Sequence, residues 1–135
     1  MIHVDTSFLI DLQREQLRER PAAAFDLIES LDPGEILGVS VHVVCELRAG
    51  AEMTRKAIAE HEALDRLLSG LLIVYPDDRF PVQYGRLLAA MRRSRVTIAS
   101  MDLLIGTAAL LDDAALVTRN VKDFAKIPGL RLLAY

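Results

Sequence analysis

Five short apolar segments alternate along the chain with stretches of helical spacing, and this alternation constrains the fold more than any other feature of the sequence. The predicted strands are residues 1–4, 35–39, 71–75, 115–118 and 130–133. They are nearly continuous apolar runs, which is typical of strands whose two faces are both buried. Such strands, alternating with helices, predict an α/β fold in which a parallel sheet lies between layers of helices.

Helices are predicted in the stretches between these strands. The first begins after Asp5, which lies in a segment rich in possible N-caps. Pro21 suits the first turn of a second helix that extends to residue 31. Ser40 is the expected cap of a helix from residue 41, and Gly50 is expected to interrupt or end it. The remaining helices are expected at residues 52–69, 79–94 and 100–112.

The composition limits the class of protein. The chain has 135 residues, a formal net charge of −3 and 52% apolar residues, which predicts a single domain over residues 1–135. Its one cysteine, Cys45, excludes an internal disulfide and a cysteine-rich zinc site. No apolar run approaches the roughly 20 residues of a membrane span, so no membrane association is expected. The N-terminal segment lacks the features of a signal peptide, and a cytoplasmic location is therefore expected.

Four acidic residues occur where the chain leaves a predicted strand or begins the next helix. Asp5 directly follows the first strand, and Glu46 lies about two turns into the helix after the second. Asp102 lies in the first turn of a helix that Ser100 is expected to cap, and Asp123 follows the fourth strand. Each has a structural interpretation as well, as an N-cap, a solvated charge, a partner of the helix dipole or a capping-box acid.

The four acids are more informative together than singly. A strand order of 3-2-1-4-5 would place them at the carboxyl edge of the sheet, where ligands bind in such folds. Carboxylates that converge repel one another and raise one another's pKa, so a cation is expected among them. All-oxygen ligands favour Mg²⁺, for which Mn²⁺ can substitute, and the three histidines lack zinc-site spacing. Without a nucleophilic side chain, this set predicts a metal-activated water that attacks a phosphodiester.

At these residues the chain resembles the PIN-domain family, specifically the VapC-type toxins of toxin–antitoxin pairs. The matching segments are VDTSFLIDL (4–12), SVHVVCELRAG (40–50) and MDLLIGTAALLDDAALVTRNVKDFAKIPGLRL (101–132). The resemblance implies a three-layer α/β/α fold with a central parallel sheet and Mg²⁺-dependent endoribonuclease activity. It also implies a homodimer and a cognate VapB-like antitoxin that occupies the active site.

The resemblance also assigns roles to individual residues. Asp5, Glu46 and Asp102 match the first three acids of the family. Many relatives have Asp where this chain has Asn120, so the fourth role is carried to Asp123. We therefore expect Asp5, Glu46, Asp102 and Asp123 to be the catalytic and metal-binding residues. Thr6, Thr118 and Asn120 are expected to support them.

An RNA substrate requires basic groups near these acids. The candidates are Arg92, Arg93, Arg95, Arg119 and Lys122, which have an alternative interpretation as solvated surface charges. With four Phe, three Tyr and no Trp, the chain has few side chains that stack on bases. Recognition is therefore expected to rely on phosphate contacts and on the shape of the RNA.

Two alternatives and one interface prediction remain. A receiver-like domain phosphorylated on aspartate would use Asp77 or Asp78 after the third strand, but no lysine ends the last strand. A non-catalytic PIN fold that only docks a partner is the second alternative.

The apolar stripe of Met53, Leu64, Leu67 and Leu68 is predicted to form a dimer interface or to pack within the chain.

Overall fold

The computed structural model describes residues 1–16 and 23–135, so the predicted helix start at Pro21 lies outside the described residues. The strands of this part are β1 (Ile2–Val4), β2 (Leu37–Ser40), β3 (Leu72–Val74), β4 (Ala115–Val117) and β5 (Leu132–Leu133). The helices are α1 (Thr6–Gln16), α2 (Ala23–Ser30), α3 (Val41–Glu52), α4 (Ala57–Leu68), α5 (Arg79–Arg93), α6 (Ser100–Leu111) and α7 (Val121–Phe124).

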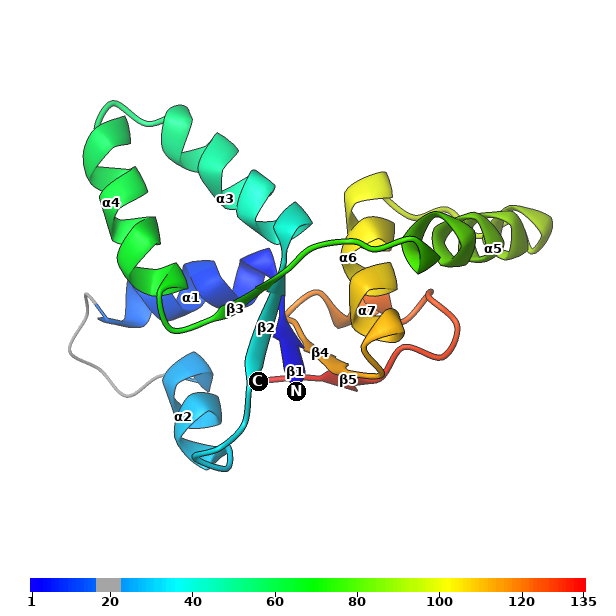
Figure 1. The fold of residues 1–135 in the computed structure, drawn as a ribbon, viewed down its shortest axis with the longest axis horizontal. Coiled ribbons are helices and arrows are strands. Elements are labelled where there is room, and N and C mark those ends of the chain that lie inside the picture. Colours follow the sequence, from blue (N-terminus) through cyan, green and yellow to red (C-terminus); the bar gives the residue numbers. More distant parts are fainter. Residues whose placement is uncertain (17–22) are drawn as a thin grey trace.

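The strands form one parallel sheet in the order β3-β2-β1-β4-β5, which confirms the predicted order (Figure 1). Successive side chains of a strand point to opposite faces of the sheet. His3 and Val4 are each 1% exposed, and Leu116 and Val117 are 0% exposed. Both faces of the central strands are therefore covered, and the predicted layer of helices on each side of the sheet is confirmed.

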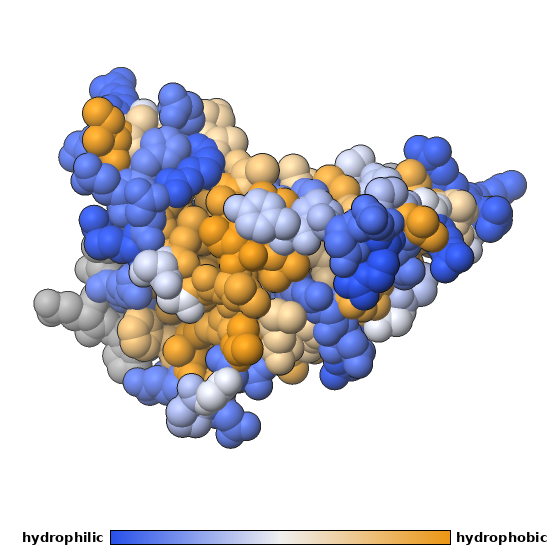
Figure 2. All heavy atoms as spheres, in the orientation of Figure 1, coloured by the Kyte–Doolittle hydropathy of each residue, from blue (hydrophilic) through white to orange (hydrophobic). Residues whose placement is uncertain are grey.

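Two groups of helices lie near the carboxyl edge of the sheet (Figure 1). Figure 1 shows α3 and α4 as one arm above this edge, with α6 on the other side and α5 extending away from it. In the view of Figure 2 the apolar surface is concentrated in the middle of the molecule, around β3, and the helical arms are mostly hydrophilic. The edge strand β3 accounts for part of this area, since Leu72 is 51% exposed.

Helix α6 packs closely against its neighbours because it is rich in small residues. Its buried positions include Gly106 and Ala109. A Cβ atom at Gly106 would lie 2.3 Å from Cδ1 of Ile127, so the glycine allows this side chain to approach the helix backbone. The close packing places the first turn of α6 beside α7, at the carboxyl edge of the sheet.

Three predicted helix boundaries were wrong. Gly50 does not end α3, which continues to Glu52, because the buried Leu47 and Ala51 hold this turn against the core. The next helix begins at residue 57 rather than 52. Ser100 is the first residue of α6, and Ala99 occupies the cap position without a side-chain hydrogen bond. Ser40 does cap α3, since its Oγ accepts from the Val43 N–H at 3.4 Å.

Two further expectations concern the surface. Leu64 and Leu68, from the stripe considered as a dimer interface, are 3% and 6% exposed and pack within the chain. Met53, at the end of α3, is 88% exposed and does not belong to that packed surface. Within residues 1–16 and 23–135, no helix is both long and apolar enough to cross a membrane.

Candidate active site

Asp5 is the first residue after β1 and is 3% exposed. It caps α1, because the Phe8 backbone N–H donates to Oδ1 at 2.9 Å. Ser7 Oγ donates to both carboxylate oxygens at 2.8 and 3.0 Å, and Thr118 Oγ1 donates to Oδ2 at 2.5 Å. Burial raises the pKa of Asp5, while these hydrogen bonds act in the opposite direction. The capping interpretation is therefore confirmed, and the same bonds orient the carboxylate.

Glu46 is anchored by the residue that follows Asp5. Thr6 Oγ1, in the first turn of α1, donates to Glu46 Oε1 at 2.6 Å. Glu46 lies in the second turn of α3, so this bond joins two helices that leave neighbouring strands. The predicted supporting role of Thr6 agrees with this contact, which holds one carboxylate oxygen of Glu46 toward α1.

Asp102 lies in the first turn of α6 and is partly buried. Burial is the main cause that raises its pKa above the ordinary value, and the charges of Glu46, Asp123 and Asp5 raise it further. All four predicted acids therefore share one electrostatic environment, although they come from four separate segments. Among the described residues, the carboxylate of Asp102 has no hydrogen-bond or ion-pair partner.

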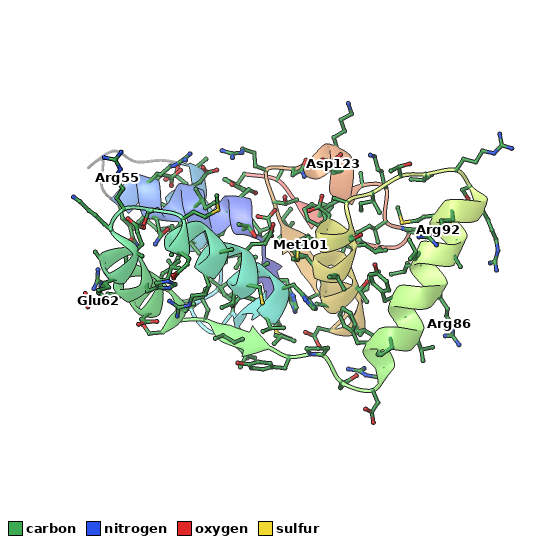
Figure 3. The ribbon with its side chains drawn as sticks, turned by 90° about the horizontal axis from the view of Figure 1, so that it is seen from above. Arg55, Glu62, Arg86, Arg92, Met101 and Asp123 are labelled. Atoms are coloured by element: carbon green, nitrogen blue, oxygen red, sulfur yellow. The ribbon has the colours of Figure 1, made fainter. Side chains whose placement is uncertain are left out.

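Asp123 belongs to α7 and lies beside a cation that was not predicted. Lys126 Nζ is 3.5 Å from Asp123 Oδ1, and it also donates to the Thr97 carbonyl at 3.0 Å. The lysine charge lowers the pKa of Asp102, against the effect of the acids. Figure 3, which looks onto the molecule from above, shows Asp123 on α7 and Met101 at the start of α6, and these two helices contact each other. Lys126 is therefore part of the electrostatics of the acidic cluster.

The chemistry of the four side chains fits a hard divalent cation. The donors are carboxylate oxygens, which Mg²⁺ and Mn²⁺ prefer. Burial is the main cause of the raised pKa of Asp102, and the neighbouring acids add negative charge that a cation would neutralise. In the described part of the chain, however, no three His, Cys, Asp or Glu side chains lie close enough together to hold a metal ion. Mg²⁺ usually keeps several water ligands, so direct contact with one or two of these carboxylates is enough to bind it.

The contact of Thr118 with Asp5 agrees with its predicted supporting role, whereas the supporting role of Asn120 stays a prediction. Thr118 is 0% exposed, and its hydroxyl also accepts from the Asn120 backbone N–H at 2.9 Å. The hydroxyl is thus committed to Asp5 and to its own loop. The capping box predicted for Asp123 was wrong, because the Asn120 N–H is already bound by Thr118 and the Asn120 side chain makes no capping hydrogen bond.

The predicted RNA contacts do not form one surface with the acids. Arg92, Arg93 and Arg95 are exposed at and after the end of α5, and Figure 3 shows α6 between Arg92 and α1. Arg119 follows β4 but pairs with Asp11 of α1 at 2.9 Å. Lys122, on α7, is the exposed candidate nearest in sequence to Asp123.

A groove of about 860 Å³ opens beside the site, between α1, α3 and α4. Its lining includes Thr6, Ile10, Glu46, Leu47, Leu64 and Leu67. Because Thr6 and Glu46 belong to both, the groove is continuous with the acidic cluster. Its walls combine an apolar floor with charged side chains, which suits an amphipathic segment.

Sequence reasoning missed four residues of the site and its surroundings. Ser7 and Lys126 had local signals, since Ser7 follows Asp5 by two positions and Lys126 has ion-pair spacing from Asp123. The other two, Asp11 and Tyr135, had none, because their partners lie more than a hundred residues away.

Comparisons with known proteins agree with this geometry. The PIN domain pattern matches residues 2–130. The chain is 30% identical to Ribonuclease VapC2 of Rickettsia felis over 116 residues, covering 86% of this chain and 87% of that protein. It is 33% identical to Ribonuclease VapC19 of Mycobacterium tuberculosis over 128 residues, covering 95% of each.

Solved structures show the same fold. The crystal structure of VapBC2 from Rickettsia felis, bound to a DNA fragment from its promoter, superposes with a TM-score of 0.87 at 28% identity and covers 100% of this chain and 99% of that chain. VapBC-1 from nontypeable Haemophilus influenzae gives a TM-score of 0.88 at 27% identity, with coverage of 99% and 98%. The chain therefore belongs to the PIN-domain family, among its VapC-type members.

Proposed function

We propose that the chain is the ribonuclease toxin of a VapBC-type toxin–antitoxin pair, acts in the cytoplasm, and cleaves RNA phosphodiester bonds with the help of Mg²⁺. The names of its relatives support the ribonuclease activity. The single observation that carries the proposal is the effect of Glu46, Asp123 and Asp5 on the pKa of Asp102. It supports a site in which four carboxylates from separate segments act together at the carboxyl edge of the sheet.

Asp5, Glu46, Asp102 and Asp123 would hold the metal. Bound Mg²⁺ would supply a Lewis acid and lower the pKa of a coordinated water. The residues of the chain prepare this site in different ways. Ser7 and Thr118 fix both oxygens of Asp5, and Thr6 fixes one oxygen of Glu46. Lys126 reduces the negative charge beside Asp123, which favours the approach of a phosphodiester.

The substrate contacts stay a prediction. Lys122 is exposed on the same short helix as Asp123 and suits a phosphate contact close to the acids. Arg92, Arg93 and Arg95 suit contacts farther along an RNA strand, beyond α6. With positive groups in both places, RNA would be bound mainly through its backbone.

A VapB-like antitoxin is the proposed partner. Several structural neighbours are described as VapBC or toxin–antitoxin complexes. The groove between α1, α3 and α4 borders Glu46, so a segment bound in it would also reach the acids. Homodimerisation, which the resemblance implies, also stays a prediction, and light scattering at micromolar concentration tests it.

RNA cleavage with Mg²⁺ and with a chelator tests the activity. We expect cleavage only with the metal, and Asp102→Asn should abolish it. Asp26→Asn is the matched control, because Asp26 also lies in the first helical turn but on exposed α2. Cleavage that persists in the chelator, or in Asp102→Asn, contradicts the proposal.

The two alternatives predict other results. A chain that binds an antitoxin but cleaves no RNA would be the non-catalytic PIN module. The receiver-like alternative predicts phosphorylation of Asp77, yet this side chain is exposed and pairs with its neighbour Arg79 at 2.8 Å.

A further inference from the structure

Asp11 collects three hydrogen bonds from two distant parts of the chain. It lies one helical turn beyond Ser7 on α1, and its side chain is 14% exposed. Arg119 Nη1 donates to both of its carboxylate oxygens at 2.9 Å, and the Tyr135 hydroxyl donates to Oδ2 at 2.7 Å. Asp11 therefore ties the loop after β4 and the segment after β5 to α1.

Tyr135 is held by its ring as well as by its hydroxyl. Its ring packs edge-on against Phe8 of α1, with 5.0 Å between the ring centroids and an angle of 87° between the planes. Phe8 is the residue whose backbone N–H donates to Asp5. Tyr135 thus supports the same turn of α1 that fixes the first acid of the cluster.

The loop after β4 is attached to α1 at three points. Thr118 Oγ1 donates to Asp5, and the Arg119 backbone N–H donates to Ser7 Oγ at 3.3 Å. The third attachment is the ion pair between the Arg119 side chain and Asp11. Helix α7, which carries Asp123, begins two residues later. The position of this loop relative to α1 therefore sets the distance between the Asp5 and Asp123 carboxylates.

The Arg119 guanidinium is directed away from the acids. Asp11 is six residues beyond Asp5, which corresponds to about 9 Å along the axis of α1. The charge of the Arg119 guanidinium is also compensated by Asp11. A phosphate bound at the acids would meet a distant and already paired guanidinium.

We propose that Asp11, Arg119 and Tyr135 form a latch that positions the loop after β4 against α1, and that Arg119 is a positioning residue rather than an RNA contact. The consequence for metal binding and cleavage rests on the proposed function; the positioning itself does not. The latch pair is partly exposed, and such pairs contribute little to global stability, so variants that break the latch are expected to fold.

The test compares Tyr135→Phe, Asp11→Asn and Arg119→Gln in the full chain, without an antitoxin. Tyr135→Phe keeps the ring on Phe8 and removes only the hydroxyl. The matched control is Arg131→Gln, which breaks an exposed arginine–aspartate pair with Asp113, away from α1. Three properties are measured: amide hydrogen exchange of residues 118–124 without metal, the Mg²⁺ concentration that gives half of the thermal stabilisation, and kcat and KM for an RNA oligonucleotide.

The latch predicts the same pattern in all three variants. Exchange in residues 118–124 should be roughly 2- to 10-fold faster, as expected for the loss of one hydrogen bond. Mg²⁺ affinity should fall about 10-fold, the lower end of the range for groups that orient metal ligands, and kcat should fall while KM stays the same. Asp11→Asn combined with Arg119→Gln should be no worse than Asp11→Asn alone, because both changes remove the ion pair between Arg119 and Asp11.

Two outcomes overturn the latch, and a third separates it from the proposed function. If Arg119→Gln raises KM while Asp11→Asn and Tyr135→Phe have no effect, Arg119 binds RNA directly. Exchange that matches the Arg131→Gln control shows that no latch exists. If the wild-type chain cleaves no RNA but the variants still exchange faster, the proposed function fails and the latch stands.

Discussion

The Asp102→Asn variant distinguishes two interpretations of Asp102: a member of a crowded acidic site, or an ordinary partner of the helix dipole. The substitution keeps the shape of the side chain and removes its charge. Asp102 has no hydrogen-bond partner among the described residues, so no such contact is lost with the charge. In the metal-free protein we therefore expect Asp102→Asn to increase the free energy of unfolding.

The magnitude follows from the neighbours of Asp102. Burial is the main cause of its raised pKa, and among its neighbours three acids raise the pKa and one lysine lowers it, which leaves a net excess of two like charges. Charge pairs at partly exposed positions contribute about 0.2–1 kcal/mol each, so removing the charge stabilises by about 0.4–2 kcal/mol. Loss of the favourable interaction with the α6 dipole destabilises by about 0.3–1 kcal/mol. Central values leave a net gain of about 0.5 kcal/mol, or roughly 2 °C in Tm.

The pH dependence of the free energy of unfolding gives a sharper test. Repulsion among the acids and attraction to the helix dipole change this free energy in opposite directions as Asp102 ionises. With a raised pKa, the folded protein binds more protons than the unfolded chain between the ordinary carboxyl pKa and the raised value. The contribution of Asp102 to stability therefore falls as the pH rises through that window, and Asp102→Asn lacks this contribution. The advantage of the variant should grow with pH and then level off. A charge that served only as a cap would give the opposite slope.

Thermal unfolding from pH 4 to 8, in a chelator and then with Mg²⁺, measures both effects. A ligand that binds only the folded state adds about 2.7 kcal/mol at a hundredfold excess over its Kd. The wild type should show this gain, and Asp102→Asn should lose most of it. Asp26→Asn, in the first turn of α2, is the control that reports the dipole effect alone. The reasoning is refuted if the stability advantage of Asp102→Asn over the wild type shrinks with rising pH. It is also refuted if Mg²⁺ stabilises Asp102→Asn as much as the wild type.

Three further predictions follow from other contacts. Asp5→Asn should destabilise the metal-free chain by about 1–3 kcal/mol in chemical unfolding, because the buried Thr118 hydroxyl loses its acceptor; unchanged stability would contradict this. Burial lowers the pKa of His3, so stability should fall as the pH drops below the ordinary histidine value of about 6.5; a His3→Gln variant with the same decline would rule out His3 as its cause. Lys126→Met should raise the pKa of Asp102 in an NMR titration, and a lowered value would show that the lysine charge does not reach it.

The strands were predictable because burial on both faces leaves a local signal, whereas their order was an assumption that the structure confirms. Each strand is a short apolar run, and five of them separated by helices permit few arrangements. The ends of the helices depend on tertiary packing. Gly50 weakens α3 by about 1 kcal/mol relative to alanine, but burial of Leu47 and Ala51 on either side outweighs this. No property of Gly50 itself shows that these neighbours are buried.

The acids were predictable for a similar reason, and their partners were not. Asp5 and Asp102 lie at fixed points of a strand–helix pattern, so the fold determines their surroundings. The bond from Thr118 to Asp5 spans 113 residues, and that from Tyr135 to Asp11 spans 124. The sequence showed that Arg119 is charged, but its partner lies 108 residues earlier. Its expected role as an RNA contact followed from the charge alone.

The four carboxylates differ in how firmly the fold holds them. Asp5 and Glu46 are fixed by hydroxyl groups of α1 and of the loop after β4. The carboxylate of Asp102 has no hydrogen-bond partner among the described residues, and Asp123 is paired only with a partly exposed lysine. A cation that joined both pairs would link α1 and α3 to α6 and α7, which pack on each other. Because one pair is oriented in advance, binding would order only the other pair, and its entropy cost would be correspondingly small. Burial and, after it, the charges of the neighbouring acids raise the pKa of Asp102, and a bound cation would relieve the repulsion among these carboxylates.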